Sequence, residues 1–115
     1  MAPVLGQRLR RTARLRDPRD FQRVNRTGTR RASAHFVAVV APSRADEAAK
    51  LGLAVSRRVG NAVARNRVKR RVREWFRRAR PVLPHATDWV VIARAGAAQL
   101  DSRTLHAELA GLAAR

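Results

Sequence analysis

The segment from Asn61 to Arg78, NAVARNRVKRRVREWFRR, carries eight basic residues and a single acidic residue, Glu74, in eighteen positions. It nevertheless keeps apolar residues at helical spacing. At roughly 100° per residue, one side of a helix collects Ala64, Val68, Val72, Trp75, Phe76 and Ala79. Such a helix has to dock its apolar stripe on a folded body while it presents a dense positive charge to the outside.

The remaining positions of this helix are almost all basic. The same projection groups Asn66, Lys69, Arg70, Arg73 and Arg77 on a second face, puts Arg65 at the border, and assigns Arg67, Arg71 and Arg78 to the far side. A solvated helix usually mixes charge signs, because like charges four residues apart repel by about a few tenths of a kcal/mol. A polyanion would relieve that repulsion, so the segment predicts contact with nucleic acid.

Composition agrees with this prediction. The 115 residues include 26 Lys and Arg against 8 Asp and Glu, a net charge of +18, which indicates a nucleic-acid partner. The length predicts one domain with one modest core. The chain has no cysteine, which excludes disulfides and a Cys-based zinc site, and no apolar run approaches the ~20 residues of a membrane span. We expect a soluble, cytoplasmic protein without a membrane partner.

Local signals divide the chain into an arm and a domain. Residues 1–16 read as a basic N-terminal arm, and residues 17–115 as a single RNA-binding domain. The first regular element is expected at Asp17, as the N-cap of a helix that continues through Pro18 and Asp20 and stops at Gly28.

Three apolar runs predict strands, at His35–Ala41, Leu51–Arg57 and Thr87–Arg94. The first two are expected to be neighbours in the sheet. The third is expected to be buried on both faces, with Trp89 in the core. In the second run Leu51, Leu53 and Val55 share one face, whereas Gly52, Ala54 and Ser56 leave the other nearly bare. A bare face leaves room for a flat group, although a covering helix is an equally good reading.

Two further helices complete the pattern. Asn61 caps the long basic helix, and Asp101 or Ser102 caps a last helix with Leu105, Leu109 and Leu112 on one side. The predicted fold is an α+β sandwich with one sheet.

Catalytic chemistry is not visible. The three histidines lack metal-ligand spacing, and no Gly-rich phosphate loop, serine nucleophile motif or carboxylate pair appears. Any reaction in which this chain takes part is expected to use a reactive centre supplied by another molecule.

One stretch carries a family resemblance. Residues 55–74, VSRRVGNAVARNRVKRRVRE, closely resemble the signature of the bacterial ribonuclease P protein component. Arg16–Thr29 resembles the family's first helix, His35–Ala41 its first strand, and Asp88–Arg94 its Asp-aromatic-apolar strand. The likeness extends roughly from Leu15 to Leu112.

The resemblance implies a fold and a function. The fold is a single-domain α/β sandwich (ribosomal protein S5 domain 2-like) with one central sheet and a left-handed βαβ crossover that carries the basic helix. The function is that of the protein subunit of ribonuclease P, an endoribonuclease that removes the 5′ leader of precursor tRNA. The RNA subunit, with Mg²⁺, carries out the hydrolysis, so no catalytic residue is expected in this chain.

The resemblance also implies two sets of site residues. Those that would hold the catalytic RNA are Arg58, Asn61, Arg65, Asn66, Arg67, Lys69, Arg70 and Arg73. Those that would line the cleft for the single-stranded leader are Arg14, Phe21, Asn25, Val37, Val39, Ala54, Ser56 and Arg57. Asn25 and Val39 stand where other members often have aromatic residues, so base stacking, typically ~1–3 kcal/mol per base, is expected to be weaker here.

Other readings remain open from charge and size. A ribosomal or general RNA-binding protein without an enzymatic role would have the same composition, and only the RNRxKR-type signature separates the two. A DNA-binding helix module fits less well, because two strands precede the basic helix. A membrane-active cationic protein would need a wider apolar face.

Overall fold

A four-stranded sheet with helices on both faces forms the body of the molecule. The computed structural model describes residues 9–43 and 47–114, so residues 1–8 of the predicted arm lie outside the described residues. The helices are α1 (Pro18–Thr27), α2 (Ala62–Ala79) and α3 (Ser102–Ala113), with three-residue 3-10 turns η1 (Arg11–Ala13), η2 (Arg80–Val82) and η3 (Ala97–Gln99). The strands are β1 (Thr29–Ala32), β2 (Phe36–Pro42), β3 (Lys50–Val55) and β4 (Thr87–Ala93).

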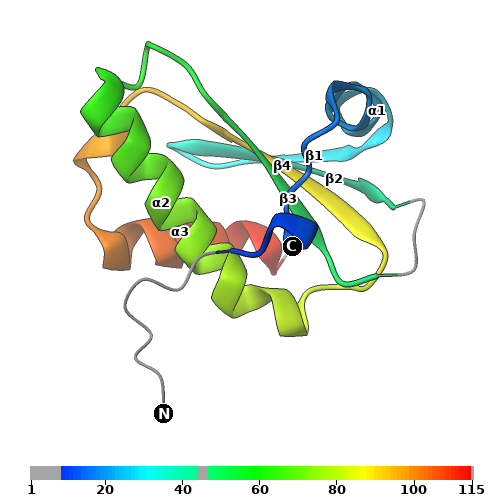
Figure 1. Ribbon diagram of the computed structural model, residues 1–115. Coiled ribbons are helices and arrows are strands. Elements are labelled where there is room, and N and C mark those ends of the chain that lie inside the picture. The colour runs from blue at the N-terminus through cyan, green and yellow to red at the C-terminus, as the bar shows by residue number, and fades with distance from the viewer. Residues whose placement is uncertain (1–8, 44–46, 115) are drawn as a thin grey trace.

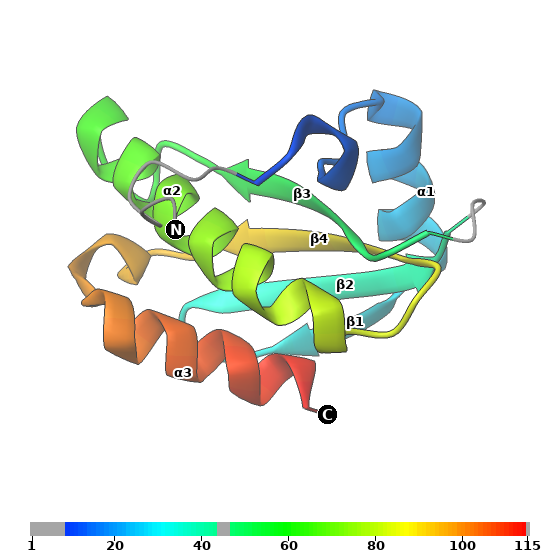
Figure 2. The same cartoon turned by 60° about the horizontal axis from the view of Figure 1, so that its bottom comes forward.

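The strand order is β1-β2-β4-β3, with β1/β2 and β2/β4 antiparallel and β3/β4 parallel. α2 connects the two parallel strands. In Figure 2, α2 lies in front of the sheet, β3 and β4 point to the left, and β4 lies below β3, which makes the crossover left-handed. Parallel crossovers are right-handed in almost all proteins, so this handedness is a distinguishing feature of the fold.

The helices cover the two faces unequally. α2 and α3 lie together on one side of the sheet and α1 alone on the other (Figure 1). The α+β class and the one-sheet architecture expected from the sequence are confirmed.

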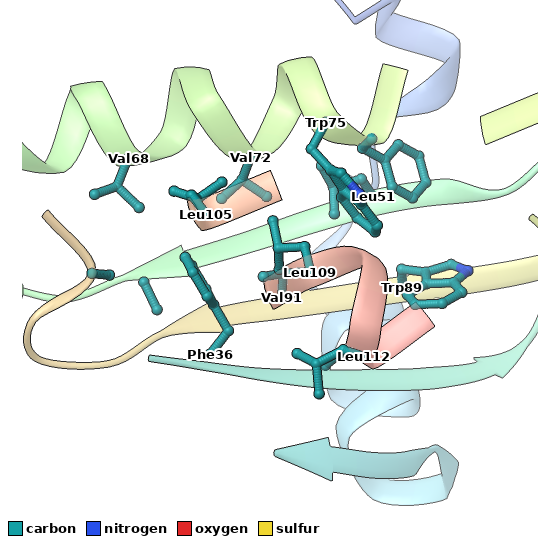
Figure 3. Packing of buried hydrophobic residues seen from close by; sticks show 14 of the residues in the cluster. Phe36, Leu51, Val68, Val72, Trp75, Trp89, Val91, Leu105, Leu109 and Leu112 are labelled. Atoms are coloured by element: carbon teal, nitrogen blue, oxygen red, sulfur yellow. The ribbon is translucent and has the colours of Figure 1, made fainter. Parts of the chain in front are cut away.

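The main core lies between the sheet and the α2–α3 layer (Figure 3). Its buried members include Val68, Val72, Trp75 and Phe76 of α2, Leu105, Leu109 and Leu112 of α3, and Phe36, Leu51, Trp89 and Val91 of the sheet. Burying one such side chain contributes roughly 1.5–3 kcal/mol. The apolar stripe predicted for the basic helix is therefore the surface by which α2 packs.

A smaller core holds α1 on the other face. Val24 is buried with Val39, Ala41 and Val90 beneath the helix. The predicted N-cap is confirmed, since Asp17 accepts a hydrogen bond from the Arg19 N–H at 2.9 Å. Gly28 is the C-cap, as predicted.

Two expectations about the elements are wrong, and one strand has no counterpart among the predicted elements. The strand β1 was not predicted, because TRRA offers no apolar alternation. The runs around β2 and β3 are not neighbours, since β4 enters the sheet between them and pairs with both. Regular structure begins before Asp17: η1 lies in the predicted arm, Leu9, Ala13 and Leu15 are buried, and the Leu15 N–H donates to the Leu51 carbonyl oxygen at 2.8 Å.

An ion-pair network pins α1 to the ends of the strands. Arg23 pairs with Asp88, which is only 3% exposed, and with Asp20 at 3.3 Å. Its guanidinium also donates to the Pro42 carbonyl oxygen at 2.7 Å. Removing one member of a buried pair leaves an uncompensated charge.

We therefore expect Arg23→Met to lower the free energy of unfolding by about 3–5 kcal/mol, because Asp88 would stay buried without its cation. Adding Asp88→Leu should recover most of the loss. Chemical denaturation measures both effects. Arg19→Met is the control, since its pair with Asp17 is exposed and should contribute at most about 1 kcal/mol. Equal losses in Arg23→Met and Arg19→Met would contradict the account.

A second polar cluster fastens the β1–β2 hairpin to α3. The Glu108 carboxylate accepts hydrogen bonds from the Ser33 hydroxyl and from the His35 backbone N–H at 2.8 Å, and lies 2.8 Å from His35 Nδ1. Burial by itself raises the pKa of Glu108, but the hydrogen bonds from Ser33 and His35 outweigh it and hold the pKa below its ordinary value.

A lowered folded-state pKa means that ionised Glu108 stabilises the fold above its unfolded-state pKa, and that this contribution is lost as the pH falls through the folded-state pKa. We expect Glu108→Gln to be destabilising at neutral pH and to differ less from the wild type as the pH falls below about 4.3. Urea denaturation across this range measures the difference. Glu47→Gln, at a more exposed carboxyl, should show no such convergence.

Candidate nucleic-acid interface

The basic residues from Arg65 to Arg73, together with Asn66, form three rows along α2. Arg65, Lys69 and Arg73, spaced by four residues, follow the side that faces β3. Asn66 and Arg70 are exposed on the outer crest, whereas Arg67 and Arg71 are half-buried. The helix thus presents cations along one flank and its crest.

The expectation that Arg67 and Arg71 lie on the far side of the helix is wrong. Arg71 donates to the Leu100 carbonyl oxygen just before α3, and the Nε atom of Arg67 is buried. Both positions flank the apolar stripe on its α3 side, because three and seven residues after Ala64 a helix has nearly returned to the same face.

Two arginines at the end of α2 share one acidic partner within the helix. Glu74 lies 2.6 Å from Arg77 and 3.0 Å from Arg78. The hydrogen bond from Arg77 is the main cause that lowers the pKa of Glu74. The only acid of α2 therefore compensates charge near its C-terminal end, and the cations from Arg65 to Arg73 have no acidic partner on the helix.

Arg65 and Arg67 share a further property. The Nε atom of each is buried and has no hydrogen-bond partner in the described part of the chain. Their stems consequently pack at the helix surface, as long cationic side chains commonly do.

The N-terminal end of α2 brings Arg58 and Asn61 close to this surface. The side-chain oxygen of Asn61 accepts a hydrogen bond from the Ala64 N–H at 2.9 Å, so its predicted capping role is confirmed. Arg58 is exposed in the turn that follows β3. Any contact of Asn61 with RNA would use its amide NH₂ group or a second lone pair of the oxygen.

The α1 face of the sheet carries an apolar row that α1 leaves partly uncovered. Strand register aligns Ala32, Val37, Ile92 and Ala54 across all four strands. Val37 and Ile92 are half-buried, and Ala32 and Ala54 are exposed. Directly opposed residues project to the same face, so the row forms a flat apolar floor.

The structure divides the predicted cleft residues. Val37 and Ala54 belong to this floor, and Ser56 and Arg57 are exposed just after β3. Val39 is 0% exposed beneath α1, so it supports the helix and presents no surface to a ligand. Asn25 is exposed on α1.

Phe21 occupies the bare face predicted at Gly52. A Cβ atom at Gly52 would lie 2.6 Å from the Phe21 ring, so only glycine allows the ring to lie against β3. The ring is half-buried. The sequence left open whether a helix or a flat group covers this face. A helix covers it at Gly52, whereas Ala54 is exposed.

Arg14 lies away from the apolar floor, at the outer edge of β3. It lines a cavity of about 300 Å³ together with Phe21, Lys69 and Arg73. The pKa of Arg73 is lowered mainly by burial and secondly by the positive charge of Arg14. The two predicted sites therefore meet at this edge.

Sequence reasoning missed two floor residues. Ile92 could have been found from the two-residue period of the strand, which puts it on the same face as Asp88 and Val90. Ala32 had no such signal, since it depends on the unpredicted β1. Within residues 9–43 and 47–114, no group of three or more His, Cys, Asp and Glu side chains could hold a metal ion, and none of the helices is both long and apolar enough to cross a membrane.

Fold and charge together define a small α+β protein that displays an uncompensated basic helix beside an open sheet face. A family model described as Ribonuclease P matches residues 9–115. The chain belongs to the ribonuclease P protein family.

Individual relatives agree with this assignment. The chain is 44% identical over 105 residues to the ribonuclease P protein component of Syntrophobacter fumaroxidans, covering 90% of this chain and 87% of that protein. It is 40% identical over 101 residues to that of Desulforapulum autotrophicum, covering 88% and 86%. The solved RNase P protein of Thermotoga maritima in complex with 1-(4-fluorophenyl)-2-thiourea is similar with a TM-score of 0.81 and 36% identity, covering 89% of this chain and 98% of that one.

Proposed function

We propose that this chain is the protein subunit of ribonuclease P, which binds the catalytic RNA and the 5′ leader of precursor tRNA and promotes endonucleolytic removal of the leader. The observation that carries the proposal is the uncompensated basic flank of α2 beside the open apolar floor, in a chain of this family. The complex is proposed to work in the cytoplasm, with neither DNA nor membrane as a partner.

The proposed contacts with the catalytic RNA come from α2. Arg65, Lys69 and Arg73 neutralise phosphates along one flank, and Arg70 does so from the crest. Asn66 adds a donor and an acceptor that suit a sugar or a base edge. Arg58 and Asn61 extend this surface towards the N-terminal end of the helix, and Arg67 adds a half-buried cation on the α3 side.

The proposed contacts with the leader come from the other side of β3. Unpaired bases stack on aromatic rings and flat apolar surfaces. Phe21 supplies the single ring, and the floor of Val37, Ile92 and Ala54 continues beside it. Ser56 and Arg57 lie at the end of the floor, where a hydroxyl and a cation reach the leader backbone.

The hydrolysis is proposed to be carried out by the RNA subunit, which also holds most of the Mg²⁺. Mg²⁺ held there by the RNA would supply activation of a water molecule and neutralisation of phosphate charge. The role of this chain is to bind and position the two RNA molecules and to lower their electrostatic repulsion, which reduces the demand for Mg²⁺.

Arg65→Ala combined with Arg67→Ala tests the α2 contacts. We expect unchanged folding and a weaker complex with the catalytic RNA, by about 1–3 kcal/mol for each lost contact. Leader removal by the assembled enzyme at limiting Mg²⁺ is the measurement. Arg19→Ala with Arg103→Ala removes the same charge from exposed positions outside both proposed surfaces. Equal activity of the two double variants would refute the assignment.

Phe21→Ala tests the leader contact. We expect weaker binding of precursor tRNA to the holoenzyme, by about 1–3 kcal/mol, and little change for mature tRNA, which has no leader. Competition binding with both tRNA forms measures this difference. If both forms lose affinity equally, Phe21 does not contact the leader.

A further inference from the structure

Glu74 is the only acidic residue on α2, a helix that otherwise collects cations. At about 100° per residue it lies on the outer side of the helix, close to the crest and four residues after Arg70. The buried residues Val72 and Phe76 lie on the opposite side. The carboxylate of Glu74 is 29% exposed, so it would face the phosphates of an RNA that followed the crest.

The Glu74 carboxylate binds two arginines of the last turns of α2. Arg77 donates to it from two nitrogens, with its Nε 3.1 Å from one oxygen and a terminal nitrogen 2.6 Å from the other. The Nε of Arg78 donates to the second oxygen at 3.0 Å. A two-point contact of this kind fixes the plane of the Arg77 guanidinium as well as its position. Both cations are thereby directed towards the helix's own acid.

The charge density of α2 falls at Glu74. From Arg65 to Arg73, six of nine positions are cations and none is an acid. From Glu74 to Arg78, two cations and one acid leave a net charge of +1 over five positions. A phosphate backbone that followed the helix would therefore be attracted as far as Arg73 and would meet a carboxylate at the next position.

Support for the helix does not explain where Glu74 stands. An acid four residues before a cation stabilises a helix at any such position. Asn66 stands four residues before Arg70, so a glutamate there would support α2 equally well. That glutamate would also put a negative charge in the middle of the proposed RNA surface. The single acid of α2 stands instead where the cation-rich part of the helix ends.

We propose that Glu74 sets the C-terminal limit of the phosphate-binding surface of α2, because it repels phosphates beyond Arg73 and holds Arg77 and Arg78 away from RNA. This inference rests on the proposed function. An unrelated RNA duplex is bound by charge alone, so it would use every accessible cation along the helix. A repulsive group at the end of the surface weakens such binding and leaves a ligand that departs from the helix there unaffected. Glu74 thus contributes to the preference for the catalytic RNA.

Glu74→Gln tests the proposal, because it removes the negative charge with little change in size and releases both arginines. The affinities of the variant and of the wild type are measured for the catalytic RNA and for an RNA duplex of unrelated sequence, each over a range of salt concentrations. Glu47→Gln is the matched control, since it removes the same charge from a carboxylate that is 52% exposed and lies outside α2.

We expect Glu74→Gln to bind the unrelated duplex roughly three- to tenfold more tightly than the wild type does. The slope of log affinity against log salt should become steeper by about one to two, because one or two further phosphates are neutralised. Affinity for the catalytic RNA should change less than about twofold, so the preference for it falls. Glu47→Gln should change the binding of both RNA molecules by the same small factor, because it alters only the overall charge.

The released arginines are tested by adding Arg77→Gln and Arg78→Gln to Glu74→Gln. This triple variant should return the affinity for the duplex and its salt dependence to about the wild-type values. Urea denaturation of Glu74→Gln measures the loss of helix support separately. A purely structural role of Glu74 would weaken the binding of both RNA molecules alike and would leave the preference unchanged.

Three results would each overturn the proposal: unchanged binding of the duplex by Glu74→Gln, an equal gain for both RNA molecules, or weaker binding of both. If the wild-type protein still stimulates leader removal in that case, the proposed function stands and only the role of Glu74 fails. A wild-type protein that gives no stimulation overturns the proposed function itself, and the role of Glu74 with it.

Discussion

The packing of α2 on the sheet is the interaction on which the rest of the structure depends. A helix with so many cations and one acid repels itself and would be unstable in isolation. Burial of Val68, Val72, Trp75 and Phe76 against the sheet and α3 offsets this repulsion. Because the stripe fixes the rotation of the helix, it also decides which cations face β3, which face solvent, and which turn back to the protein, as Arg71 does.

The packing of α2 also decides how far each face of the sheet is covered. With α2 and α3 on one face, only α1 covers the other, and the Arg23–Asp88 pair holds it at one end of the strands. The opposite end keeps the open row from Ala32 to Ala54. β3 is an edge strand, so side chains from both sides of the sheet can approach each other around it. Arg14 and Arg73, which were predicted for separate roles, therefore line one cavity there.

Local signals in the sequence predicted the helices well. Asp17, Asn61 and Asp101 each cap a helix as expected, because a cap depends on residues within one turn. Sheet order could not be predicted in this way. β4 lies between β2 and β3 because of contacts between residues far apart in the sequence. β1 has a polar sequence and forms because it pairs with β2.

The site was predictable to a similar degree. The apolar stripe of α2 identified its buried face, but the placement of Arg67 and Arg71 depended on where α3 packs. The leader-cleft residues came from family resemblance, and the structure separates them: Val39 is covered by α1, Phe21 fills the space above Gly52, and Ile92 joins the floor through register. The spacing of residues along the chain does not show which of them a distant helix or strand will bury.

Stimulation of a cognate ribonuclease P RNA is the most direct test of the central claim. The purified protein would be added to the RNA at low Mg²⁺ and physiological salt, and the rate of 5′-leader removal from precursor tRNA measured. A faster rate than that of the RNA alone, absent with an equally basic control protein, is the predicted result. Tight RNA binding without stimulation would contradict the account and favour a ribosomal or general RNA-binding protein.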